Sequence, residues 1–359
     1  MAEPQRPGGR PALSGGQQNF LDAVRITAAG MVLLGHGFFL TDLTAFAAGD
    51  RFPLLQDLGV VIFFLLSGFL TASSLERRNA RGDDCFRDFF LHKLGRIMKE
   101  YIPALLLIAL LDAVSIRCNP GQYRYYDTYN LKTFLGNLLF LQWTAVNRLP
   151  GVQMLAFGSG KPLWTLSLEW YFYLLFARVF LAIRNREKLG LWDMALLGVL
   201  LLFPYEYLIG GRGGGLGCVF ALGVLGYYFY GSIERRAAPI LFAGSLVALL
   251  GYGCLRTEAY AVIPFLLLWL ALCAGVRTFS GGRGRNRFTA YLSGSTFMLY
   301  LLHWTVFELL IRLELLLGNL ATLLLGTALS LLCAILMYEF FGRRELLYAV
   351  LPKRKKGRG

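Results

Sequence analysis

Long apolar runs recur along this chain of 359 residues, and they constrain its fold more than any other feature. Each run is close to the roughly 20 residues that a helix needs to cross a bilayer. The runs cover residues 22–41, 55–75, 101–117, 163–183, 191–209, 215–231, 238–255, 259–276, 289–312 and 319–341. Charged residues make up only 16% of the chain, whereas an ordinary soluble domain has about a quarter. Because the sequence lacks the sustained two-residue alternation of a membrane barrel, we predict an all-α, polytopic integral membrane protein with about ten transmembrane helices.

The positions of basic residues predict the topology. A weaker apolar candidate, residues 131–147, would add one more span. If it crossed, the basic clusters at 184–188, 235–236 and 283–287 would lie outside, together with the basic tail. If it does not cross, all of them face the cytoplasm, as the positive-inside rule prefers. We therefore expect both termini in the cytoplasm, and residues 118–162 as one external loop with a re-entrant or interfacial helix.

A single membrane domain is expected over residues 20–342. It follows a disordered cytoplasmic lead-in, 1–19, and precedes a basic cytoplasmic tail, 343–359. The net charge of +14 lies largely in short loops and in this tail, which is typical of topology signals and of contacts to anionic lipid. Nucleic acid is therefore not an expected partner. The six cysteines form no CxxC pair, so we expect neither a disulfide framework nor a metal site.

Titratable side chains inside apolar spans are costly, and they mark functional candidates. Two of the three histidines, His36 and His303, lie in spans, as does Glu169. With the topology above, all three reach the outer half of the membrane from different helices, and a shared polar cavity would spare each an unpaired burial. A histidine beside a carboxylate is the arrangement of a general base and its orienting partner.

Each of these residues also has a structural interpretation. A buried histidine can serve only as a hydrogen-bonding group, and Glu169 can pair with an arginine such as Arg178. Ser67 precedes a glycine, and such pairs commonly let membrane helices approach closely. The aromatic residues of the 118–162 loop are typical of interfacial anchors, or form a platform for sugar rings.

Four motifs follow one another between about residues 20 and 340. They are LDAVRITAAGMVLLGH at 21–36, GVVIFFLLSGF at 59–69, PLWTLSLEWYFY at 162–173 and STFMLYLLHW at 295–304. Together they resemble the membrane-bound acyltransferase-3 family, the O-acyltransferases of surface glycans and other hydroxyl acceptors. By this resemblance Arg25 and His36 form the family's Arg-x10-His motif, His36 is the essential catalytic residue, and Glu169 is the carboxylate of a later motif. The chain departs from the family at Trp170, where an acidic residue is common, and at Thr305, where proline is frequent.

The resemblance implies an acyl-CoA donor, most simply acetyl-CoA, and a glycan hydroxyl as acceptor. The family has a basic motif followed by Tyr-Pro before its third span. Cations of that region, with Arg25, are expected to hold the phosphates of the donor through charge-assisted hydrogen bonds. These cations are Lys93, Arg96 and Lys99.

We expect His36 to take the proton of the acceptor hydroxyl while Glu169 orients it. A covalent acyl-histidine intermediate is an alternative. Substrate-binding residues are expected at Ser67, Trp164, His303 and Trp304. The expected partners are acyl-CoA, a carbohydrate acceptor and the lipid of the cell membrane, without a metal.

A transporter or flippase of a glycan-lipid or small molecule is the second hypothesis, because buried His and Glu residues also form proton relays. The basic inner rim distinguishes the two classes, since a relay does not need those cations. A purely structural scaffold explains the converging titratable groups least well.

Overall fold

The computed structural model describes residues 12–43, 55–82, 85–209, 213–256, 258–282, 284–313 and 318–343. Within these ranges the chain is helical and contains no strand. The longer helices are α1 (Gly15–Leu40), α2 (Leu55–Ala80), α3 (Phe86–Cys118), α5 (Trp164–Asn185), α6 (Leu191–Leu202), α8 (Leu216–Phe229), α9 (Ala238–Leu255), α10 (Val262–Thr278), α11 (Arg287–Arg312) and α12 (Asn319–Met337). The short helices α4 (Leu131–Leu138) and α7 (Glu206–Ile209) lie between them, and α12 continues as a π-helical turn, η8 (Tyr338–Gly342).

Seven of the described helices are long and apolar enough to cross a membrane: α1, α2, α3, α5, α9, α11 and α12. The apolar helices α6, α8 and α10 are shorter. Nine of the ten predicted spans each coincide with one helix, whereas residues 191–209 divide into α6 and α7. The prediction of an all-α, multi-pass membrane protein is confirmed. The count of ten spans and the cytoplasmic position of both termini stay predictions.

Residues 131–147, the weaker candidate span, do not form a long helix. The Asn130 side chain caps α4 by accepting a hydrogen bond from Thr133 N at 2.9 Å. The helix has 8 residues, or about 12 Å of length, far short of a bilayer. The backbone then turns at Phe140 and Trp143, which both have positive φ angles. The prediction that residues 131–147 do not cross the membrane therefore agrees with the length of this helix.

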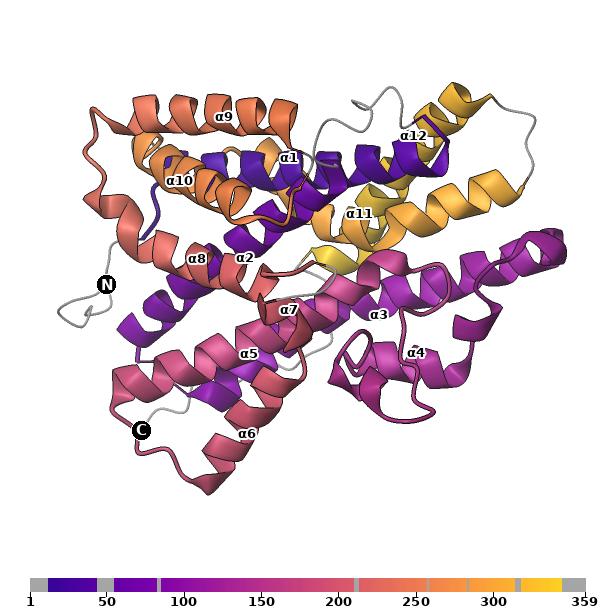
Figure 1. The fold of residues 1–359 in the computed structure, drawn as a ribbon, viewed down its shortest axis with the longest axis horizontal. Helices are drawn as coiled ribbons and strands as arrows, with labels where there is room; N and C mark the ends of the chain where they lie inside the picture. The colour runs from indigo at the N-terminus through magenta and orange to yellow at the C-terminus, as the bar shows by residue number, and fades with distance from the viewer. Residues whose placement is uncertain are drawn as a thin grey trace.

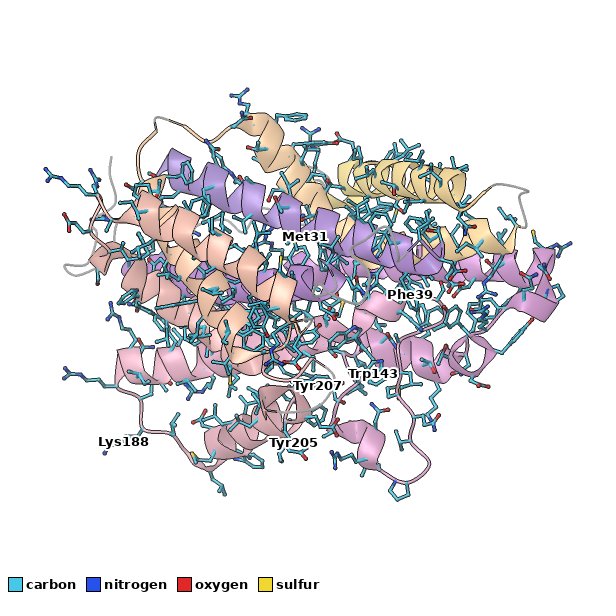
Figure 2. The ribbon with its side chains drawn as sticks, turned by 45° about the horizontal axis from the view of Figure 1, so that its top comes forward. Met31, Phe39, Trp143, Lys188, Tyr205 and Tyr207 are labelled. Carbon is cyan, nitrogen blue, oxygen red and sulfur yellow. The ribbon has the colours of Figure 1, made fainter. Side chains whose placement is uncertain are left out.

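The central helices are α1, α2 and α11 (Figure 1), whereas α9 packs on α10 and α6 packs on α5. α2 contacts α1 and α8, whereas α11 contacts α1, α3 and α12. Side chains fill the spaces between the ribbons (Figure 2). α2 and α8 approach very closely: a Cβ atom on Gly68 would lie 2.0 Å from Phe220 O, and one on Gly223 would lie 2.1 Å from Leu65 O. This close approach supports a packing role for the Ser67–Gly68 pair.

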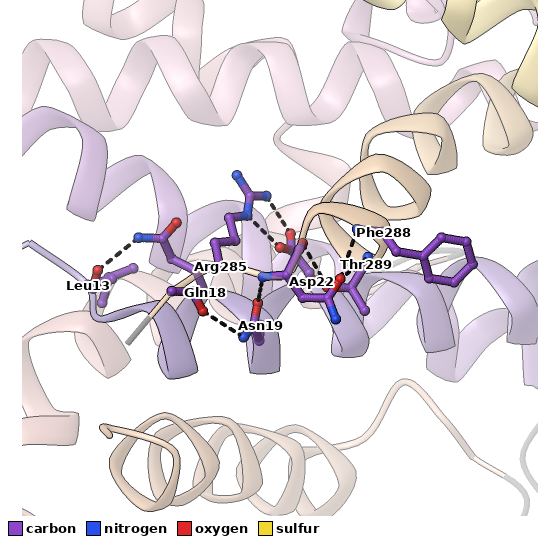
Figure 3. Close-up of polar contacts among 9 residues, drawn as sticks. Leu13, Gln18, Asn19, Asp22, Arg285, Phe288 and Thr289 are labelled. Carbon is purple, nitrogen blue, oxygen red and sulfur yellow. Dashed lines mark hydrogen bonds and ion pairs between the residues drawn. The ribbon is translucent and has the colours of Figure 1, made fainter. Parts of the chain in front are cut away.

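The start of α1 is fastened to the connection between α10 and α11 (Figure 3). Asp22 accepts two hydrogen bonds of 2.7 Å from the guanidinium of Arg285. Asn19 accepts from Asn286 N at 2.6 Å and donates to Gly284 O at 3.2 Å. These contacts fix α1 along its axis, and with it the heights of the residues that it carries.

The sequence predicts a disordered lead-in and a basic tail at the ends of the chain. α1 begins at Gly15 behind the N-cap Ser14, so residues 15–19 of the expected lead-in are helical. Residues 1–11 and the tail from 344 lie outside the described residues.

Candidate functional site

The two histidines of the predicted spans form a hydrogen-bonded pair between α1 and α11. His36 Nδ1 lies 2.8 Å from His303 Nε2, and His303 Nδ1 lies 2.9 Å from Leu299 O. A carbonyl oxygen only accepts, so His303 carries its proton on Nδ1, and the Nε2 of the neutral ring must accept. His36 therefore donates from Nδ1, and its Nε2 is the basic nitrogen. This is the tautomer that a general base requires.

Trp304 packs edge-to-face on the His36 ring, with a centroid distance of 4.9 Å and an interplanar angle of 80°. His303 is 1% exposed and Trp304 is 5% exposed. The sequence placed His36, His303 and Trp304 in one site, and the packing of α1 against α11 brings these three together.

A second polar cluster surrounds Glu169. The hydroxyls of Ser67 and Tyr173 both donate to Glu169 Oε1, and the Tyr173 hydroxyl lies 3.1 Å from Ser67 Oγ. Lys93 Nζ lies 3.3 Å from the centroid of the Tyr173 ring. Tyr173 was not among the predicted site residues. The signal that could have found it is its i+4 spacing from Glu169, which places both on one face of α5.

Three of the four predicted donor-binding cations gather at this cluster. Arg25 and Lys93 each interact electrostatically with Glu169 and with Arg96. Lys99 lies elsewhere: it donates to Gly342 O of η8, and its Nζ is 3.9 Å from the Glu100 carboxylate.

The histidine pair and the Glu169 cluster lie at different depths. Thr165 Oγ1 is 2.7 Å from the Tyr300 hydroxyl, so these two side chains meet at one depth in the membrane domain. Glu169 is one turn further along α5 than Thr165, and Tyr300 is one turn before His303 on α11. The helices run in opposite directions, so Glu169 lies at least about 10 Å along the axis from the histidine pair, toward the level of Arg25.

This separation differs from the expected shared cluster. The sequence predicts that His36 pairs with Glu169, whereas in the structure His36 hydrogen-bonds to His303 and Glu169 accepts from Ser67 and Tyr173. The physical reason is the height at which α5 packs against α11, since α5 begins at Trp164 as the sequence predicts but its first turn meets Tyr300. Glu169 therefore comes a turn further in.

Tyr300 occupies the space between the two groups. Its ring centroid lies 6.1 Å from that of His303 and 5.6 Å from that of Phe63, and it also interacts electrostatically with Glu169. Tyr300 is not among the residues predicted from the sequence, although it precedes His303 by three residues and shares its helix face.

A family model described as an acyltransferase domain, the acyltransferase-3 model, matches residues 18–339. The chain belongs to the membrane acyltransferase-3 family. Comparison with curated proteins and with solved structures gave no match. The matched range includes every predicted site residue of this acyltransferase, from Arg25 to Trp304.

The remaining predicted residues of the acyltransferase do not join the histidine pair. The Trp164 ring packs 5.7 Å from that of Tyr207 on α7, a residue labelled in Figure 2. Ser67 belongs to the Glu169 cluster. Of the four residues expected to bind substrate, His303 and Trp304 are thus the two that contact His36.

Proposed function

We propose that this member of the acyltransferase-3 family is an O-acyltransferase of the cell membrane. It transfers an acyl group, most simply acetyl, from cytoplasmic acyl-CoA to a hydroxyl of a surface or exported glycan. The observation that carries the proposal is the His36–His303 hydrogen bond, because its direction leaves a basic Nε2 on His36 within the matched domain.

His36 acts as the general base. Its Nε2 takes the proton of the acceptor hydroxyl as the oxygen attacks the thioester carbonyl, and the C–S bond breaks. The departing thiolate then receives the proton from the imidazolium. His303 accepts the hydrogen bond from His36 Nδ1–H throughout, which holds the tautomer and stabilises the imidazolium, the role of the third residue in a catalytic triad.

The Glu169 cluster serves the donor. Arg25, Lys93 and Arg96 bind the phosphates of CoA, and the Glu169 carboxylate offsets part of the repulsion among them by attracting Arg25 and Lys93. Arg25 and His36 lie about 16 Å apart along α1. The arm that links the phosphates to the thioester spans this distance, so the donor binds at one level and reacts at the other.

The test is transfer of radiolabelled acetyl groups from acetyl-CoA to glycans in membranes that contain the protein. We expect His36→Ala to lower the rate about 100-fold or more, which is the usual contribution of a positioned base. His92→Ala is the matched control, since His92 is exposed on α3, and it should keep full activity. Full activity of His36→Ala would overturn the assignment. A wild-type protein that moves substrate across the membrane without labelling any glycan would favour the transporter hypothesis.

A further inference from the structure

Tyr125, in the segment that joins α3 to α5, reaches across to α11. Its hydroxyl donates to Glu308 Oε1 and accepts a hydrogen bond of 3.2 Å from Trp304 Nε1. One hydroxyl therefore links a carboxylate to the indole that packs on His36. Tyr125 lies 179 residues before Trp304 and 183 before Glu308, which share α11. None of these contacts is needed for the proton transfer described above.

Glu308 is held firmly enough to orient this hydroxyl. Arg312 Nη2 donates to Glu308 Oε2 at 2.6 Å, and the two side chains are only 4% and 9% exposed. The guanidinium carbon of Arg312 lies 5.6 Å from the ring centroids of both Tyr123 and Tyr125. Breaking a buried ion pair is strongly unfavourable, so the carboxylate oxygen that faces Tyr125 stays in place.

The same segment also contacts Trp304 from a second position and contacts its neighbour on α11. Lys161 Nζ lies 5.1 Å from the Trp304 ring. On the neighbouring residue of α11, Thr305 Oγ1 accepts a hydrogen bond of 2.8 Å from Ser159 Oγ, and the backbone N–H of Ser159 donates to Asp112 Oδ2 at 2.8 Å. Residues 123–161 are thus anchored next to the histidine pair at both of their ends.

We propose that Tyr125 is a positioning residue that acts through Trp304 on His36, so that the segment between α3 and α5 sets the orientation of the base. The inference rests on the proposed function. With its Nε1–H bound, the indole cannot turn about its side-chain bonds, and its edge-to-face contact keeps the His36 ring directed at His303. Without the Tyr125 hydroxyl, the buried Nε1–H of Trp304 loses its acceptor, the indole reorients, and His36 loses one of its supports.

The experiment compares Tyr125→Phe with Tyr126→Phe in the acetyl-transfer assay. Tyr126 is the matched control, because its hydroxyl is exposed and donates to Pro120 O at 3.0 Å in the same segment. For Tyr125→Phe we expect the maximal rate to fall about fivefold, the equivalent of one hydrogen bond. The acetyl-CoA concentration for half-maximal rate should not change. Tyr126→Phe should match the wild type.

A double-mutant cycle tests whether Tyr125 acts through Trp304. Trp304→Phe removes the Nε1–H and keeps an aromatic ring, so adding Tyr125→Phe to it should cause no further loss of rate. The inference would be overturned if the rate losses of the two single variants multiplied in the double variant. It would also be overturned if Tyr125→Phe were as fast as Tyr126→Phe. A general folding defect would lower the amount of active protein in both backgrounds equally, and would thus appear as a multiplying loss.

The two hypotheses fail separately. If His36→Ala keeps full activity, the proposed function falls. If His36→Ala is inactive while Tyr125→Phe behaves like its control, only the positioning role of Tyr125 falls.

Discussion

Replacing His303 tests which residue orients His36. The structure gives His36 Nδ1–H an acceptor 2.8 Å away, at His303 Nε2. In the imidazolium that forms during transfer, this becomes a hydrogen bond from a charged donor, with a contribution of about 1.5–3 kcal/mol. Since each 1.36 kcal/mol changes a rate tenfold, His303→Ala should lower the maximal rate about 10- to 150-fold.

The variant needs a control for packing, because His303 is 1% exposed and truncation to alanine also leaves a cavity. His303→Gln keeps most of the volume. Its amide oxygen can accept from His36 while its NH₂ group donates to Leu299 O, so we expect it to restore part of the rate that His303→Ala loses. The assay is the initial rate of acetyl transfer against acetyl-CoA concentration, with the melting temperature of each purified variant measured beside it.

Glu169→Ala should change a different kinetic parameter from the one that the His303 variants change. Because Glu169 lies with Arg25 and Lys93, its loss should raise the acetyl-CoA concentration for half-maximal rate more than it lowers the maximal rate. The opposite pattern, with His303 variants near wild type and Glu169→Ala without turnover, would refute the two-level site and restore Glu169 as the orienting residue.

Two further predictions concern stability. A Cβ atom on Gly68 would lie 2.0 Å from a backbone oxygen of α8, whereas one on Gly30 would meet nothing within 4 Å. Gly68→Ala should therefore destabilise the protein by about 1–3 kcal/mol, and Gly30→Ala should leave its stability unchanged. Equal melting temperatures of the two variants would contradict this prediction. Between α5 and α6, hydrogen bonds from Asn185 at 3.1 Å and Arg178 at 2.7 Å hold the pKa of Glu187 below its ordinary value. The folded state therefore gains stability above the unfolded pKa of about 4.3 and loses it as the pH falls through the folded pKa. The difference in melting temperature between the wild type and Glu187→Gln should be small, since Glu187 is 38% exposed. It should shrink as the pH falls below about 4.3 and through the folded pKa, and a difference that does not shrink on acidification would be inconsistent with the ion pair.

The sequence by itself determined the class of fold and the family. Runs of about 20 apolar residues without two-residue alternation favour helices inside a bilayer. Nine of the ten predicted spans are single helices, and residues 191–209 form two. The Arg25–His36 spacing and three further motifs carried the family resemblance, which the match over residues 18–339 confirms. The cost of burying titratable groups singled out His36, His303 and Glu169 as candidates, because that cost depends on local composition alone.

Only the tertiary structure decided which of these groups meet. A helix shifted by one turn moves its side chains by about 5.4 Å, and no local pattern fixes the height of α5 against α11. The height at which α5 packs therefore placed Glu169 with Ser67 and Tyr173 and left His303 as the partner of His36. The contact from Tyr125 to Trp304 is likewise beyond sequence reasoning, since it joins residues 179 positions apart. Such a contact depends on how the segment folds back on α11, and long-range packing sets that path.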